Sequence, residues 1–151
     1  MGISPEQGLR ESKKLTDQEE TPFMITVTGT RENYIAEMTA DRGTLNATHC
    51  DIPVEQGGQN AYMRPGETLL SALGACMNIT ARKYLNRDGL DYESVTVKAE
   101  MARENGVTKI RTKLEIHGAL SQADKDRIIA EVASCPVCEI LSGPIELGKL
   151  D

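Results

Sequence analysis

The residues best suited to chemistry in this 151-residue chain are its cysteines, Cys50, Cys76, Cys135 and Cys138. A cysteine thiolate can attack an electrophile or bind a metal ion. Cys135 and Cys138 form a Cys-Pro-Val-Cys motif, and such spacing is interpreted as a redox pair, as half of a zinc site, or as chance. In a reducing compartment, cysteines are more often reactive, metal-bound or simply buried than joined in structural disulfides.

The position of this motif bears on the first two interpretations. A structural zinc ion takes four ligands, so His49 and Cys50 would have to supply the missing pair. Adjacent residues on a strand point to opposite faces, which disfavours that ligand set. A glutaredoxin-like redox site precedes most of its fold, whereas only residues 139–151 follow the motif here. The motif is therefore not glutaredoxin-like, and a zinc-bound structural module stays as an alternative.

Cys76 lies in residues 65–85, a stretch whose pattern predicts one long helix. Pro65 suits the first helical position, where a missing N–H costs nothing. Glu67 would lie in the first turn, where the helix dipole favours a carboxylate. Apolar residues cover most of the helix surface, so we expect it to be buried on nearly all sides, with Leu69 and Ile79 on the face that carries Cys76. From composition alone, Cys76 is a small core residue.

The segments before this helix predict an antiparallel meander of strands at residues 23–30, 34–39 and 44–48. They are rich in β-branched residues, and Asp-Arg-Gly at 41–43 is typical of the turn between the last two. Residues 51–64 contain Pro and a Gly-Gly pair, which predicts a long loop of the kind that often borders a site.

The segments after the helix predict a hairpin and two further helices. Residues 94–103 and 107–117 alternate apolar and polar side chains, and the Asn-Gly pair between them is a strong hairpin signal. Ser121 begins a helix in the pattern of a capping box. That helix should break before Pro136, which can open a second short helix ending at Gly143.

The break at Pro136 predicts the surroundings of the motif cysteines. We expect Cys135 to be exposed at the kink and its thiol to point away from that of Cys138, which would pack inside the short helix. Residues 145–150 predict a last strand. Because the strands are grouped and do not alternate singly with helices, the fold class is α+β with antiparallel sheets.

Length and charge limit the remaining classes of function. We expect a single domain at residues 21–151, preceded by a mobile or loosely attached polar tail at residues 1–20. A net charge of −6 and 3% aromatic residues argue against nucleic-acid binding. The apolar run of the long helix is too short to span a membrane. The first residues lack an apolar signal core, which predicts a cytoplasmic protein.

Two stretches resemble a known family. PGETLLSALGACMNIT at residues 65–80 resembles the long helix of the OsmC/Ohr family (osmotically induced protein C and organic hydroperoxide resistance protein), and CPVCEIL at residues 135–141 resembles its second cysteine motif. The order of elements agrees from about Phe23 to the C-terminus. The resemblance implies an intertwined α+β homodimer with the long helix at its centre.

The same resemblance implies a peroxidase that reduces organic hydroperoxides as part of oxidative stress defence. Cys76 matches the peroxidatic cysteine and Cys135 the resolving one. The family also uses an arginine from the N-terminal strands, for which Arg31 is the first candidate and Arg42 the second, and a glutamate at the helix start, here Glu67. Members of the hydroperoxide-resistance type carry that glutamate one position earlier, where this chain has glycine.

The implied chemistry agrees with these residue types. Only a thiolate attacks a peroxide oxygen; burial raises the pKa of a thiol and a nearby guanidinium lowers it. Attack would leave a sulfenic acid on Cys76, which condenses with Cys135 to a disulfide that a dithiol reductant restores. No cofactor is required. The alternatives are an OsmC-fold protein without peroxidase activity that binds a small apolar ligand, and the Cys-Pro-Val-Cys metal-binding module.

Overall fold

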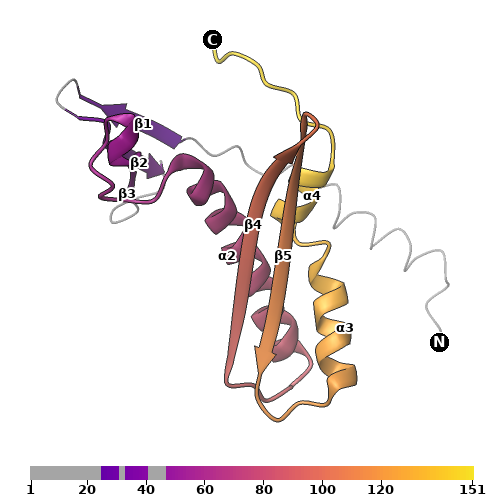
Figure 1. Cartoon of the computed structure of the whole chain (residues 1–151). Coiled ribbons are helices and arrows are strands. Elements are labelled where there is room, and N and C mark those ends of the chain that lie inside the picture. The colour runs from indigo at the N-terminus through magenta and orange to yellow at the C-terminus, as the bar shows by residue number, and fades with distance from the viewer. Residues whose placement is uncertain (1–24, 31–32, 41–46) are drawn as a thin grey trace.

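The computed structural model describes residues 25–30, 33–40 and 47–151 and has the α+β architecture expected from the sequence (Figure 1). The predicted tail at residues 1–20 and the turn at 41–43 lie outside the described residues, as do Arg31 and Arg42.

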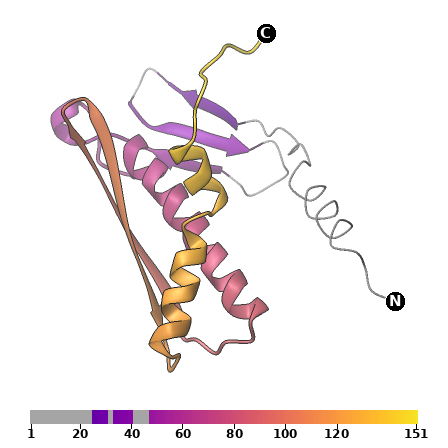
Figure 2. The ribbon, with the colours of Figure 1, turned by 90° about the vertical axis from the view of Figure 1, so that its right-hand side faces the viewer.

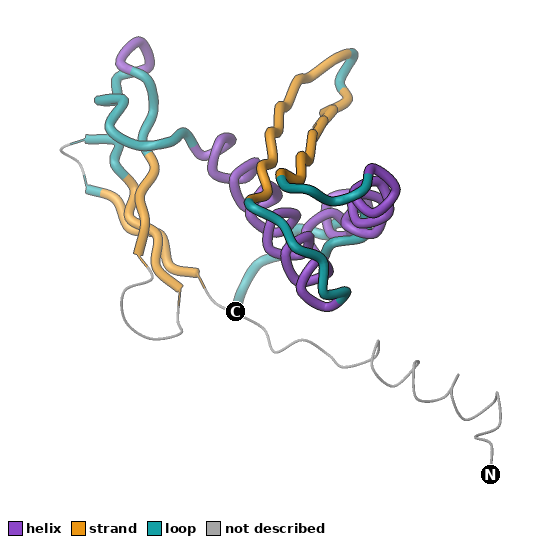
Figure 3. The backbone as a smooth tube through the Cα atoms, turned by 90° about the horizontal axis from the view of Figure 1, so that it is seen from below, coloured by secondary structure: helices purple, strands orange, loops and turns teal. Residues whose placement is uncertain are grey.

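The strands before the long helix form the predicted meander. β1 (Ile25–Gly29), β2 (Ala36–Ala40) and β3 (Ala47–Cys50) make an antiparallel sheet in the order β1-β2-β3. Figure 3 shows this sheet apart from the hairpin and the helices of the C-terminal half, joined to them through the loop that leads into the long helix. A short 3-10 helix, η1 (Val54–Gln56), lies in that loop.

The long helix α2 (Pro65–Arg87) begins where the sequence predicted and extends two residues beyond Leu85. Its buried stripe, at a spacing of four residues, consists of Leu73, Met77, Ala81 and Leu85. Leu69 and Ile79 were expected on the buried face, but 44% and 50% of their surfaces are exposed. The expectation of burial on nearly all sides is therefore wrong for this single chain, because the neighbouring elements cover only part of the helix. No helix in the described part of the chain is long and apolar enough to cross a membrane.

A hairpin of two long strands covers one side of α2 (Figures 1 and 2). β4 (Ser94–Glu104) and β5 (Val107–His117) pair along their whole length. Asn105 and Gly106 connect them with φ of 52° and 78°, the left-handed conformation that an Asn-Gly hairpin turn requires. The hairpin predicted from the sequence is confirmed.

Two helices complete the packing around α2. α3 (Gln122–Val132) begins at Ser121, whose hydroxyl accepts a hydrogen bond from the Asp124 N–H at 3.1 Å, and α4 (Pro136–Ser142) follows after a break. The core lies between α2, the hairpin and these helices, and its fully buried side chains include those of Leu85, Ile128 and Val132.

The predicted last strand at residues 145–150 is wrong. These residues have no regular structure, and Leu147 is 97% exposed. A strand needs a neighbour to pair with, and in the described residues β4 and β5 pair only with each other. Alternation alone therefore does not produce a strand here.

Candidate active site at the cysteine cluster

Cys135 occupies the N-cap of α4, between the two C-terminal helices. Pro136 disfavours helical geometry in the preceding residue, and Cys135 accordingly has an extended backbone, with φ of −61° and ψ of 152°. Its side chain is fully buried, at 0% exposure, in the core beside Val132. The expected exposure at the kink is wrong, because the break between α3 and α4 packs against α2 and not toward solvent.

The Cys135 thiol turns toward Cys138, contrary to the predicted divergence. The Cys135 side chain turns back over the start of α4, where its Sγ accepts a hydrogen bond from the Cys138 N–H at 3.4 Å. The Cys138 thiol donates to the Val132 carbonyl, at 3.9 Å. This capping role explains the difference, since it directs the Cys135 sulfur along the helix toward the residue three positions later.

Cys76 reaches the same place from the middle of α2. It is half-buried and packs against the core cluster that contains Cys135. The fold therefore brings together at one cluster the three cysteines of α2 and α4, all of them free thiols, of which Cys135 is fully buried. Cys50 lies elsewhere: it is buried at the end of β3, with its sulfur 3.0 Å from the Thr68 hydroxyl.

The buried thiol of Cys135 is shifted toward its protonated form. Burial raises the pKa of Cys135, and its contact with the Cys138 thiol raises it further. The Cys138 N–H and the Cys76 thiol oppose that shift by donating hydrogen bonds to the sulfur. A thiol that stays protonated at neutral pH is a poor first nucleophile. Cys135 is thus better placed to react second, with an oxidised neighbour.

Glu67 does not lie in this cluster. Nine residues separate it from Cys76, which is two and a half helical turns, so the two side chains leave α2 on opposite sides and about 13 Å apart along its axis. Its carboxylate instead accepts the Arg64 N–H at 2.8 Å and the Arg64 Nη2 at 3.0 Å. These hydrogen bonds lower the pKa of Glu67, and the bond from the Arg64 backbone N–H contributes most.

Arg64 is a site candidate that the sequence interpretation missed. It lies immediately before Pro65 and three residues before Glu67, the spacing at which a helix-start carboxylate reaches back to the N-cap. Among the described residues it is the arginine that Glu67 holds. Arg31 and Arg42 lie outside the described residues.

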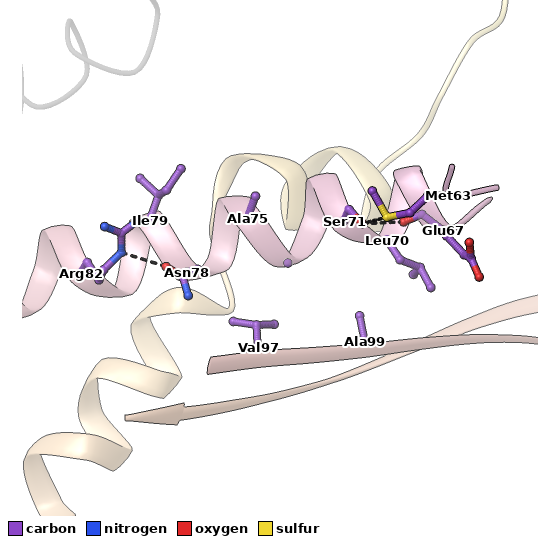
Figure 4. Close-up of a pocket in the computed structure, with 11 residues that line it drawn as sticks. Met63, Glu67, Leu70, Ser71, Ala75, Asn78, Ile79, Arg82, Val97 and Ala99 are labelled. Atoms are coloured by element: carbon purple, nitrogen blue, oxygen red, sulfur yellow. Dashed lines mark hydrogen bonds between the residues drawn. The ribbon is translucent and has the colours of Figure 1, made fainter. Parts of the chain in front are cut away.

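A groove of about 780 Å³ runs along the exposed side of α2, next to β4 (Figure 4). Figure 4 shows Val97 and Ala99 pointing from β4 toward the helix, and Ile79 pointing away from the strand. Glu67 and Arg82 lie at its two ends, and Asn78 donates a hydrogen bond to the Val95 carbonyl at 2.8 Å. Small and apolar side chains line its middle, so the groove suits an apolar molecule or an apolar protein surface. Cys76 is not among its lining residues.

A second feature missed in the sequence is Asp51, which organises the loop before α2. Its carboxylate is buried, at 1% exposure, and accepts the backbone N–H groups of Ile52, Gln59 and Ala61 at 2.8, 3.2 and 3.0 Å. The bond from Ala61 contributes most to lowering the pKa of this carboxyl. Asp51 thus fixes the loop that leads to Arg64.

The described residues contain no group of three His, Cys, Asp or Glu side chains placed to hold a metal ion. His49 at the end of β3 stacks on Tyr62, with ring centroids 4.9 Å apart. The ligand set considered for zinc, with His49 and Cys50 joining the motif, is therefore not assembled.

The chain is similar to one protein family and to several solved structures. The family described as OsmC-like protein matches residues 57–148, and no curated protein sequence matches the chain. An OsmC-like protein from Mycoplasma pneumoniae has a TM-score of 0.66 at 20% identity, covering 83% of this chain and 90% of its own. An organic hydroperoxide resistance protein from Elizabethkingia anophelis has a TM-score of 0.62 at 23% identity, covering 85% and 94%. The organic hydroperoxide resistance protein OsmC from Legionella pneumophila has a TM-score of 0.61 at 20% identity, covering 83% and 93%. Identities this low show a shared fold.

Proposed function

The chain belongs to the OsmC-like protein family, and we propose that it is a thiol peroxidase that reduces organic hydroperoxides. Solved structures that share its fold include organic hydroperoxide resistance proteins. The observation that carries the proposal is that the half-buried Cys76 packs against the core cluster that contains the fully buried Cys135. A peroxidase of this kind needs a reachable sulfur for the peroxide and a second sulfur next to it.

The reaction proceeds in three steps. The Cys76 thiolate attacks the outer peroxide oxygen, the O–O bond breaks, and the alcohol leaves with a proton while Cys76 becomes a sulfenic acid. The Cys135 thiol then displaces the sulfenic hydroxyl, which leaves as water, and a Cys76–Cys135 disulfide forms. A dithiol reductant finally reduces that disulfide by thiol–disulfide exchange. Such a cycle requires a reducing compartment, and we place the protein in the cytoplasm.

Activation of Cys76 involves Arg31 and Glu67 in this proposal. A guanidinium beside the thiol favours the thiolate because it cannot lose its own proton. The Glu67 carboxylate orients an arginine, as it does Arg64 here. Because Glu67 leaves α2 on the side opposite Cys76, a single chain does not complete this arrangement with its own Glu67.

A homodimer resolves that separation. Leu69 and Ile79 of α2 are about half exposed, and Ile79 lines the groove. The sheet of β1, β2 and β3 stands apart from the hairpin and the C-terminal helices (Figure 3). A second copy of the chain would cover the apolar side of α2 and bring a second set of N-terminal strands to it. The pocket so enclosed would be apolar and would favour organic hydroperoxides over hydrogen peroxide.

Consumption of cumene hydroperoxide in the presence of dithiothreitol tests the proposal. Wild type and Cys50→Ser should consume the peroxide catalytically, whereas Cys76→Ser should not. Cys50 is the matched control because its thiol is buried at the end of β3 against the Thr68 hydroxyl, outside the cysteine cluster. A wild-type rate equal to that of Cys76→Ser would exclude the peroxidase.

The second candidate function is binding of a small apolar ligand without peroxidase activity. The groove beside β4 favours it, since about 780 Å³ is ample for such a ligand. The engagement of Glu67 by Arg64 favours it as well, because a carboxylate held there does not orient an arginine at Cys76. A protein that binds an apolar dye at this groove and leaves cumene hydroperoxide intact would support this function.

A further inference from the structure

The geometry points to Cys138 as the second member of a disulfide relay, in which the Cys76–Cys135 disulfide passes to the Cys135–Cys138 pair before a dithiol reductant collects it. This inference rests on the proposed peroxidase function. It assigns a redox role to Cys138, and it assigns the entry of the reductant to a hollow that Cys138 lines and Cys76 does not.

The three sulfurs are arranged in the order that a relay needs. Cys135 belongs to the buried core cluster, and Cys76 and Cys138 both pack against that cluster. The Cys138 N–H lies 3.4 Å from the Cys135 sulfur, at the first turn of α4. The Cα atoms of residues three apart on a helical turn are about 5 Å apart, which is within the Cα separation of about 4.4–6.8 Å that a disulfide spans. The central sulfur can therefore bond to either neighbour in turn.

The surroundings of the half-buried cysteine distinguish the two disulfides, since each would join the fully buried Cys135 to a half-buried partner. Cys138 lines a hollow of about 350 Å³ between β5, α2 and α4, and Cys76 is not among the residues that line it. Leu73, Met77 and Leu141 form apolar walls there, and Thr108 and Thr112 of β5 add hydroxyl groups. A small dithiol fits a hollow of this volume.

The transfer step conserves electrons. The Cys138 thiol loses its proton to solvent and its thiolate attacks the Cys135 sulfur. The Cys138–Cys135 bond forms as the Cys135–Cys76 bond breaks, and Cys76 leaves as a thiolate. The dithiol then attacks the Cys138 sulfur in the hollow, releasing Cys135, which takes up a proton. The second thiol of the reductant displaces Cys138, so that the reductant ends as a disulfide and both motif cysteines end as thiols.

The relay would separate peroxide and reductant in space. Cys76 returns to its reduced form while the disulfide is held at Cys138, which lines the hollow. A Cys138 that only packs would leave the Cys76–Cys135 bond as the final oxidised state. A relay and a purely structural Cys138 therefore differ in which disulfide is present at the end of the reaction.

Time-resolved disulfide mapping decides between them. The background is the Cys50→Ser protein, in which only the clustered thiols can react. It is fully reduced and then mixed with one equivalent of cumene hydroperoxide. Samples are quenched in acid at increasing times, alkylated and digested. We expect the Cys76–Cys135 bond first and the Cys135–Cys138 bond at the end, with Cys76 again alkylated. Adding Cys138→Ser, with Cys138→Ala as a second variant, should stop the reaction at Cys76–Cys135.

The outcomes separate the relay from the proposed function. If the background protein rests at Cys76–Cys135 with Cys138 alkylated, the relay is wrong and the peroxidase stands. If Cys135–Cys138 forms equally in a Cys76→Ser variant, the pair is oxidised without Cys76 and the relay is wrong. If hydroperoxide leaves every thiol alkylated, the proposed function fails and the relay with it. The background protein needs no change in the cluster, so the result does not depend on whether the Cys138 variants fold.

Discussion

Adjacent isoleucines in α3 provide a sharp test of how the cysteine motif is held. Ile128 is fully buried against the core, whereas Ile129 is 36% exposed. Ile128→Ala removes three carbon atoms, which at about 0.8 kcal/mol each amount to about 2.4 kcal/mol of lost burial. The cavity left behind raises the expected loss to about 3–4 kcal/mol. For Ile129→Ala, only part of the side chain is buried, and we expect a loss of about 1 kcal/mol.

The measurement is urea unfolding followed by far-ultraviolet circular dichroism. Both variants and the wild type are compared at one protein concentration, because association would add a concentration-dependent stabilisation. In thermal unfolding, the Ile128→Ala loss corresponds to a fall in Tm of roughly 10 °C for a chain of this size. Because α3 leads directly into Cys135, we also expect slower formation of the Cys76–Cys135 disulfide in this variant.

Equal losses for the two variants would refute this reasoning. They would mean that α3 does not bury Ile128 in the core while leaving Ile129 partly exposed to solvent. The position of Cys135 at the end of the same helix would then be wrong too. Unchanged disulfide formation despite a destabilised Ile128→Ala would refute only the link between α3 packing and the cysteine cluster.

Further predictions concern the loop, the activating charge, a helix cap and assembly. The lowered pKa of Asp51 stabilises the fold above the ordinary pKa of the carboxyl and ceases to do so as the pH falls through the depressed value; Asp51→Asn should therefore lower Tm at pH 7, by a difference that shrinks on acidification. Arg31→Met should slow the alkylation of Cys76 at neutral pH when the other cysteines are replaced. Ser121→Ala should cost about 1 kcal/mol in urea unfolding by removing the α3 cap. Ile79→Glu should convert a dimer to a monomer in light scattering, since Ile79 is on the exposed apolar side of α2.

Three of these predictions have a specific outcome that would contradict them. An Asp51→Asn effect that persists unchanged at low pH would contradict the role of the ionised carboxylate. Equal alkylation rates in wild type and Arg31→Met would bring Arg42 forward. A wild-type monomer at micromolar concentration, with intact secondary structure, would contradict the homodimer directly.

Several elements of the fold were predictable from the sequence because their signals lie within a few residues. Pro65 and the apolar run after it predicted α2, Asn105-Gly106 predicted the hairpin turn, and Pro136 predicted the break between α3 and α4. These signals act through backbone sterics, which do not depend on distant parts of the chain. The α+β class follows from their order, and the resemblance to the OsmC/Ohr family rests on the motifs around Cys76 and Cys135.

The direction and burial of the side chains were decided only by the tertiary structure. Pro136 gave Cys135 an extended backbone as predicted, yet packing of the break against α2 buried its thiol and turned it toward Cys138. Residues 145–150 alternate like a strand, but no neighbour pairs with them in the described chain. Burial and pairing depend on residues far apart in the sequence, and a local pattern contains no information about which of its faces those residues will cover.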